Sequence, residues 1–211
     1  MNRQPIVFVV DDDDAVRNSL RLLLKSASLS TTAFASAQEF LAGWTADQPG
    51  CLVLDVRMPG MSGLELQEEL NRRGAIIPVI FISGHADVPM AVEAIQHGAF
   101  DFLQKPFSDQ DLIDRIQRAL AADADNRRAL QQLDELRTRY ASLTPREQEV
   151  LVLVTDGRAN KVMAGDLGVS QRTIEIHRAR VMEKMGARSV AQLVRMTLDL
   201  GIGGASATDS R

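Results

Sequence analysis

The chain has 211 residues, of which 45% are hydrophobic and 25% are charged, with a formal net charge of −4 and one cysteine, Cys51. One cysteine excludes an intrachain disulfide, and no apolar stretch approaches the roughly 20 residues that a membrane helix needs. The amino-terminal residues lead directly into an apolar run and do not form a signal-peptide pattern. We therefore expect a cytoplasmic protein with no membrane partner.

The charge is divided unevenly along the chain. Residues 1–122 carry 10 basic and 16 acidic side chains, whereas residues 123–211 carry 14 basic and 12 acidic ones. Between positions 170 and 188, five basic residues stand against two acidic ones, a cluster that a solvated helix face also explains. The difference between the halves predicts two domains with different partners.

The first 107 residues alternate short apolar runs with helical patterns. Helical periodicity lies between the runs, for example in residues 14–27, where Leu20 and Leu24 share a stripe, and in residues 87–98. Strands that alternate with helices indicate an α/β fold with a parallel sheet wrapped on both faces. The five predicted strands cover residues 6–10, 31–35, 51–56, 78–83 and 99–105.

A fifth helical pattern begins after Ser108 and continues toward Tyr140. Its apolar positions are spaced like the seam of a paired helix, but residues 121–128 (AADADNRR) interrupt that seam. We interpret 109–140 as a helix followed by an exposed helical linker, which could pair with a second copy of the chain.

The carboxyl-terminal part reads as an all-α domain. Helices are predicted over 145–156, 160–167, 170–185 and 189–200, with Pro145 at a first helical position and Ser170 as an N-cap. A short helix, a tight turn at Gly168 and a longer basic helix indicate a helix-turn-helix. The small and polar residues 201–211 predict a disordered tail.

Charged and hydroxyl side chains follow the predicted strands of the first domain. Asp11 and Asp12 follow the first strand, and Asp55, Ser83 and Lys105 end the third, fourth and fifth. Because the carboxyl ends of parallel strands share one edge, these residues should converge. Clustered carboxylates suit Mg²⁺, and an aspartate beside Mg²⁺ and a lysine can form an aspartyl phosphate.

The next two aspartates of the acidic run have different predicted roles. Asp14 stands where it would cap the first helix. Asp13 lies close to the predicted site, and its role stays open between a contact with metal-bound water and a solvated surface position. His85 borders the site by its position after the fourth strand.

Residues 1–122 resemble a response-regulator receiver domain through VVDDDD, LDVRMPGMSG, FISGH and DFLQKPF, in that order. The resemblance implies a flavodoxin-like sheet with strand order 2-1-3-4-5. It implies that Asp55 is the phosphoacceptor, that Lys105 holds a phosphoryl oxygen, and that the Lys105–Pro106 bond is cis. It also implies that Ser83 and Phe102 are the switch residues. The implied Mg²⁺ ligands, which Mn²⁺ could also use, are Asp11, Asp12, Asp55 and the backbone carbonyl of Arg57.

A phosphatase of the haloacid-dehalogenase type is the enzymatic alternative, because such enzymes also use a nucleophilic aspartate after an apolar strand. They carry a second acid two residues later as proton donor. Arg57 occupies that position here, which argues against the phosphatase.

The third helix of the second domain divides into two faces. Ile174, His177, Val181 and Met185 form an apolar stripe, which predicts the core side. On the opposite side, the residues that could read base edges in a major groove are Arg172, Glu175, Ile176 and Ala179. The residues that suit phosphate contacts are Asn160, Lys161, Ser170, Thr173, Arg178, Arg180 and Lys184.

This segment resembles the LuxR-type DNA-binding domain through LTPREQEVL, ANKVMAGDLGVSQRTIEIHR and KMGARSVAQLV. The whole chain therefore resembles the FixJ/NarL group of transcriptional response regulators. Glu175 stands where relatives often carry lysine, so their base preference does not carry over. We expect a receiver domain over 1–122, a helical linker over 123–142, a DNA-binding domain over 143–200 and the tail over 201–211.

The resemblance implies a phosphorylation-activated transcription factor and not an enzyme, with slow autodephosphorylation as its only expected turnover. A sensor histidine kinase would phosphorylate Asp55, and the chain would then dimerise, release its helix-turn-helix, or both. Promoter DNA and RNA polymerase are the expected further partners. A phosphorylation-switched interaction module that does not bind DNA is the alternative from another functional class.

Overall fold

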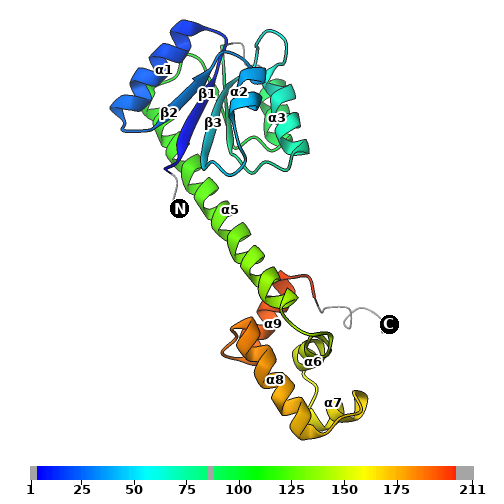
Figure 1. The fold of residues 1–211 in the computed structure, drawn as a ribbon. Coiled ribbons are helices and arrows are strands. Elements are labelled where there is room, and N and C mark those ends of the chain that lie inside the picture. Colours follow the sequence, from blue (N-terminus) through cyan, green and yellow to red (C-terminus); the bar gives the residue numbers. More distant parts are fainter. Residues whose placement is uncertain (1–3, 85–87, 203–211) are drawn as a thin grey trace. The chain divides into compact units, whose positions relative to one another are not determined.

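The computed structural model describes residues 4–84 and 88–202, and these fall into two compact units, 1–127 and 128–211 (Figure 1). Two sequence-based expectations, the position of His85 and the start of a helix at Asp87, lie outside the described residues. So does most of the predicted tail, residues 203–211. None of the described helices has both the length and the apolar character that a membrane span requires.

The first unit is built on a five-stranded parallel sheet, as predicted. The strand order β2-β1-β3-β4-β5 confirms the order 2-1-3-4-5. β3 is buried along its whole length, because the sheet is covered on both faces and apolar residues such as Leu52 and Val53 fill both sides. The strands are β1 (Ile6–Val10), β2 (Thr31–Phe34), β3 (Gly50–Asp55), β4 (Val79–Ser83) and β5 (Asp101–Gln104).

Helices cover the two faces of the sheet from opposite sides. On one face α2 (Ala37–Gly43) and α3 (Gly63–Arg72) pack through Phe40 and Leu66, and α4 (Val88–Gln96) adds Ala94 (Figure 1). On the other face α1 (Asp14–Ser26) and the start of α5 (Asp109–Ala141) pack through Leu24 and Ile116. This arrangement leaves the carboxyl ends of the strands free of helices, and their loops carry the charged residues.

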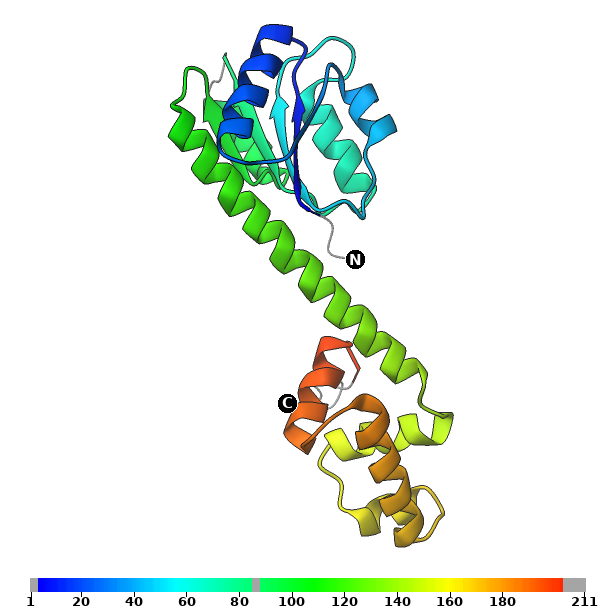
Figure 2. The ribbon, with the colours of Figure 1, turned by 60° about the vertical axis from the view of Figure 1, so that its left-hand side comes forward.

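Helix α5 is one continuous helix of 33 residues that includes residues 121–128, where the apolar seam but not the helix was expected to break (Figure 2). Charged residues interrupt the apolar seam in that stretch, yet one of them, Asp123, is only 1% exposed. Its Oδ2 accepts the backbone N–H of Gly50 at 2.9 Å and pairs with Arg127 one helical turn later. The first unit therefore extends past residue 122 to Arg127.

The second unit contains the four predicted helices around a core that includes Leu151, Met163, Ile174, Val181 and Leu193. Pro145 occupies a first helical position, and Thr144 forms a reciprocal capping box with the next turn. A left-handed glycine at position 186 ends the third of these helices. The helices are α6 (Pro145–Thr155), α7 (Asn160–Asp166), α8 (Gln171–Met185) and α9 (Val190–Asp199).

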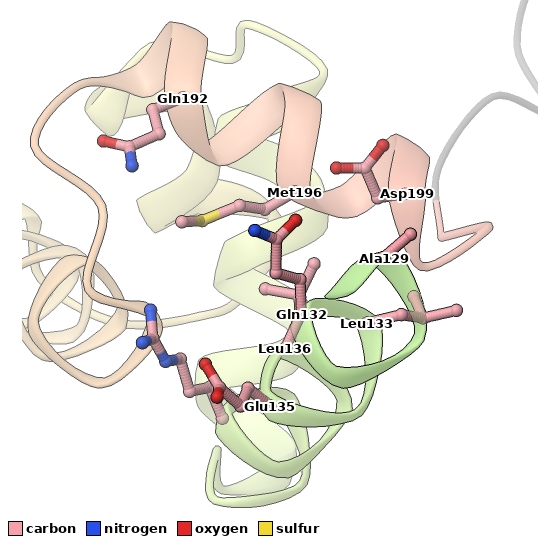
Figure 3. A pocket seen from close by; sticks show the side chains of 9 residues that line it. Ala129, Gln132, Leu133, Glu135, Leu136, Gln192, Met196 and Asp199 are labelled. Atoms are coloured by element: carbon pink, nitrogen blue, oxygen red, sulfur yellow. The ribbon is translucent and has the colours of Figure 1, made fainter. Parts of the chain in front are cut away.

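The last turns of α5 pack against the second unit. Leu136 is 9% exposed and joins the core, and Arg139 donates to the carbonyl of Met185 at 3.2 Å. A groove of about 690 Å³ lies between this part of α5 and α9, and Figure 3 shows Met196 of α9 facing Gln132 and Leu136 of α5.

Candidate functional site

The predicted site residues of the first unit meet at the carboxyl edge of the sheet. Asp11 follows β1, Asp55 ends β3, and Lys105 follows β5. The ammonium of Lys105 donates to Asp11 Oδ2 and to Asp55 Oδ1, each at 2.9 Å. Three side chains that are far apart in the sequence therefore form one ion cluster. The cis Lys105–Pro106 bond, which the resemblance implied, is present beside it.

This cluster is largely removed from water. Asp11 is 1% exposed and Asp55 is 8% exposed. Burial raises the pKa of Asp11, although the hydrogen bond from Lys105 opposes that shift. For Lys105, burial acts to lower the pKa, but the hydrogen bonds to Asp55 and Asp11 outweigh it and leave the pKa raised. A protonated Lys105 therefore lies between two buried carboxyl groups at neutral pH.

The loop after β3 holds Asp55 from behind. The backbone N–H of Arg57 donates to Asp55 Oδ2 at 2.8 Å, and the N–H of Gly63 donates to the carbonyl of Val56 at 2.9 Å. A Cβ at Gly63 would lie 2.2 Å from the carbonyl oxygen of Asp55, so this position requires glycine. Sequence reasoning did not single out Gly63, and the glycine that opens α3 after Ser62 was the available signal.

The structure corrects one prediction about the acidic run, residues 11–14. Asp13, and not Asp14, is the N-cap of α1: its Oδ1 accepts the backbone N–H groups of Ala15 at 2.7 Å and Val16 at 3.4 Å. Asp14 is the first helical residue and forms an ion pair with Arg17. The helix begins at Asp14, where the predicted helical pattern also begins, because Asp13 has the extended backbone of a cap.

The donor atoms at this edge fit a hard divalent cation in type. They are carboxylate oxygens of Asp11, Asp12 and Asp55 together with backbone carbonyls, and Mg²⁺ commonly binds one or two carboxylates and keeps several waters. Within the described residues no group of three acidic, histidine or cysteine side chains is preassembled as a cage. Asp12 is exposed, and its carboxylate has no partner among the contacts of the described chain. The edge can thus offer a partial ligand set that water would complete.

The predicted switch residues lie beside the cluster on the last two strands. Ser83 ends β4 at 2% exposure, and its carbonyl accepts the N–H of Lys105 at 2.8 Å. Phe102 on β5 is half-buried, and its ring centroid lies 6.2 Å from that of Phe81. The switch role of these two residues stays a prediction.

In the second unit α8 has the two predicted faces. Ile174, Val181 and Met185 are buried, and the His177 ring is half-buried. The four candidates for base reading lie on the exposed side, where Ile176 is 45% exposed. They are Arg172, Glu175, Ile176 and Ala179, of which the first two form an ion pair at 3.5 Å. A single exposed isoleucine is common on protein surfaces, so the exposure of Ile176 by itself assigns no role to this face.

The candidates for phosphate contacts are placed differently from one another. Lys161 and Arg180 are exposed, and Arg178 donates to Asn160 Oδ1 at 2.6 Å, which links α8 to the start of α7. Ser170 caps α8 by accepting the N–H of Thr173 at 3.1 Å, and the two hydroxyl groups lie 2.9 Å apart.

Lys184 makes contacts within the second unit. Its ammonium donates to Glu147, which is 2% exposed, at 2.6 Å, and to the carbonyl of Ser142 at 3.1 Å. The hydrogen bond from Lys184 lowers the pKa of Glu147, and the N–H of Thr144 adds to this shift. These contacts use Lys184 in the packing of the second unit.

Comparison with known proteins identifies both parts of the chain. Residues 7–117 match the response regulator receiver domain, and residues 141–197 match the bacterial regulatory proteins of the luxR family. The transcriptional regulatory protein FixJ of Azorhizobium caulinodans is 50% identical over 196 residues, which cover 93% of each chain. Nodulation protein W of Bradyrhizobium diazoefficiens is 49% identical over 197 residues, covering 93% of this chain and 87% of that one.

Solved structures agree with these matches. The response regulator StyR has a TM-score of 0.85 at 47% identity and covers 92% of this chain and 98% of its own. Full-length FixJ from B. japonicum has a TM-score of 0.57 at 40% identity, covering 95% of this chain and 98% of its own. The similarity therefore extends over both units.

Proposed function

Because the chain belongs to the FixJ/NarL group of response regulators, which are phosphorylation-dependent transcriptional regulators, we propose that Asp55 carries the phosphoryl group. The observation that supports this proposal is the ammonium of Lys105 at 2.9 Å from Asp55 Oδ1, at the open edge of the sheet. Of the clustered carboxyl groups, Asp55 is the less buried, at 8% exposure against 1% for Asp11. An incoming phosphoryl donor can therefore reach it more easily.

The proposed reaction is an in-line transfer from a phosphohistidine of a sensor kinase. An oxygen of the Asp55 carboxylate attacks phosphorus, the new P–O bond forms as the P–N bond breaks, and the imidazole leaves with the electron pair. Lys105 neutralises charge on the phosphoryl oxygens during the transfer. The residues that would hold Mg²⁺ are Asp11, Asp12, Asp55 and the carbonyl of Arg57, and the bound cation would add further positive charge there.

Phosphorylation is proposed to act through the last two strands. A new phosphoryl oxygen at Asp55 gives the hydroxyl of Ser83 an acceptor, and movement of that hydroxyl lets Phe102 repack. The adjacent helix α4 exposes Val92 and Ile95 by 48% and 47%. Repacking of this face is our proposed route to a homodimer, to release of the second unit, or to both.

The second unit is proposed to read promoter DNA with α8. Glu175 can accept from a cytosine amino group, and Ile176 or Ala179 can contact a thymine methyl, with Arg172 at the edge of the same face. The phosphate contacts are proposed for Asn160, Lys161, Ser170, Thr173, Arg178 and Arg180, whereas Lys184 is left out because Glu147 holds it. RNA polymerase is the proposed later partner. Because promoter DNA lies in the bacterial cytoplasm, we propose that the protein acts there.

Labelling with acetyl phosphate tests the phosphorylation site. We expect Asp55→Asn to abolish the mass increase of one phosphoryl group, because the amide is not a nucleophile. Asp114→Asn, which changes an exposed aspartate on α5, is the matched control and should label normally. Persistent labelling of Asp55→Asn would assign the phosphoryl group to another residue.

Binding to specific and random duplexes tests the DNA surface. We expect Glu175→Ala to relax base preference by about 1–3 kcal/mol, and Arg178→Ala to weaken binding to all sequences and to reduce the salt slope by about 1. Arg195→Ala, at an exposed cation on α9, is the control. Equal losses on both duplexes for both variants would contradict this division of roles. Failure of the wild type to shift a random duplex at low salt would favour an interaction module without DNA binding.

A further inference from the structure

Arg17 lies in the first turns of α1, and its side chain returns to the end of β1. Its Nη1 donates to the backbone carbonyl of Asp11 at 2.6 Å, and its Nη2 forms an ion pair with Asp14. The Arg17 side chain is 14% exposed, whereas that of Asp14 is 86% exposed. A long side chain is thus largely buried against the main chain of the acidic run.

The ion pair with Asp14 does not account for this arrangement. An exposed ion pair contributes little to stability, and this small gain does not exceed the entropy lost when an arginine side chain is ordered. The contact with the carbonyl of Asp11 is different, because it joins the end of β1 to α1 across the four aspartates. An arginine can make it together with the pair to Asp14, since the planar guanidinium has several donors in a fixed geometry.

Further hydrogen bonds hold the backbone of the acidic run in place. The N–H of Asp13 donates to Asp11 Oδ1 at 2.9 Å, and the N–H of Arg17 donates to the carbonyl of Asp13 at 3.0 Å. Asp11 binds Lys105, Asp13 caps α1, and Asp14 binds Arg17. Among the contacts of the described residues this leaves Asp12 as the carboxylate of the run with no competing partner.

We propose that Arg17 is a positioning residue for the metal site: it fixes the turn from Asp11 to Asp14 so that Asp12 is available to a divalent cation. This inference rests on the proposed phosphorylation pocket. Groups that orient metal ligands typically change metal affinity by about 10- to 100-fold when they are mutated. If Arg17 served only as a local positive charge, its removal would have the opposite effect, because the site would attract Mg²⁺ more strongly.

Titration calorimetry with Mg²⁺ on the unphosphorylated full chain separates these roles. We expect Arg17→Lys and Arg17→Gln each to weaken Mg²⁺ binding by about tenfold, because neither side chain can hold both partners as arginine does. Arg21→Gln, which changes an exposed cation on the same helix, should leave the affinity unchanged. Tighter binding by Arg17→Gln with unchanged binding by Arg17→Lys would overturn the inference in favour of a pure charge effect.

A second readout separates positioning from stability and from failure of the pocket itself. Excess Mg²⁺ should restore the acetyl-phosphate labelling rate of Arg17→Lys but not that of Asp55→Asn. A lower melting temperature with unchanged Mg²⁺ affinity would reduce Arg17 to a structural residue and overturn the inference. If the wild type binds no Mg²⁺, both the metal site of the proposed function and the positioning role are wrong. If the wild type binds Mg²⁺ and the Arg17 variants bind it with the same affinity, only the positioning role is wrong.

Discussion

The first unit contains two buried carboxylate–cation clusters, one at the carboxyl ends of its strands (the carboxyl edge) and one at their amino ends (the amino edge). The two clusters use different cations. At the carboxyl edge a single ammonium, Lys105, lies between Asp11 and Asp55. At the amino edge Arg127 Nε contacts both oxygens of Asp123, at 3.0 and 2.8 Å. The same guanidinium donates to the carbonyls of Ala46 at 3.0 Å and Gln48 at 2.8 Å, and Asp123 also accepts the N–H of Gly50 at 2.9 Å.

The difference separates a structural cluster from the cluster that we propose is phosphorylated. The partners of Asp123 and Arg127 are fixed in one geometry, and they fasten α5 to the loop before β3. At the other edge two carboxyl groups share one cation, and burial raises the pKa of Asp11. A group whose charged form is disfavoured by the fold lowers stability at neutral pH, a cost that functional sites commonly carry.

The largest expected effect concerns the amino edge. Arg127→Met should lower the free energy of unfolding of the first unit by about 3 kcal/mol, because it leaves the buried Asp123 carboxylate without its cation. Denaturant unfolding followed by fluorescence measures this directly, since Trp44 is the only tryptophan of the chain. The double variant Asp123→Asn/Arg127→Met is the control, and it should regain much of the loss. A loss of less than about 1 kcal/mol in Arg127→Met would show that the cluster is not a structural lock.

A smaller effect of opposite sign is expected at the carboxyl edge. Asp11→Asn should raise the free energy of unfolding by about 1 kcal/mol at neutral pH, because it removes a desolvated carboxylate while Lys105 keeps Asp55. Since the pKa of Asp11 is raised in the fold, the gain should be full above that folded pKa. It should vanish below the ordinary aspartate pKa of about 4. Asp123→Asn should instead destabilise the protein, and equal signs for the two variants would remove the distinction between the edges.

The same contrast explains which features could be predicted from sequence. Asp11, Asp55 and Lys105 were predictable because the carboxyl ends of parallel strands share an edge, whatever the details of packing. The burial of Asp123 was not predictable, because its partner Gly50 is 73 positions away and contributes only a backbone N–H. The pairing of Lys184 with Glu147, 37 positions away, was missed because it depends on how α6 and α8 pack, which the helical pattern of either segment does not show.

Errors of a local kind had a different origin. Asp13 and Asp14 are both good N-caps by residue type, and only the backbone conformation at Asp13 decides between them. The role of Arg17 depends on a backbone carbonyl at Asp11, which has no signature in the side-chain sequence. The contact of Arg17 with the main chain was therefore a part of the site that side-chain patterns could not supply.

The smallest expected effect extends the comparison to the second unit, where Glu147 pairs with Lys184. The hydrogen bond from Lys184 lowers the pKa of Glu147, so this carboxylate stabilises the fold above its ordinary pKa of about 4.3. The contribution should be lost as the pH falls through the lowered pKa of the folded state. Glu147→Gln should remove this acid dependence, because the amide does not titrate.

Thermal unfolding of the wild type and Glu147→Gln between pH 3 and 7, followed by circular dichroism, measures the effect. The melting temperatures of the second unit should differ at pH 7 and converge at the acid end. Glu149→Gln is the matched control, because Glu149 lies on the same helix in an exposed ion pair with Arg146. A pH-independent difference between the wild type and Glu147→Gln would mean that Glu147 acts through the shape of its capping contacts. In that case the charge of Glu147 would contribute nothing to the stability of the second unit, unlike the charge of Asp123 in the first.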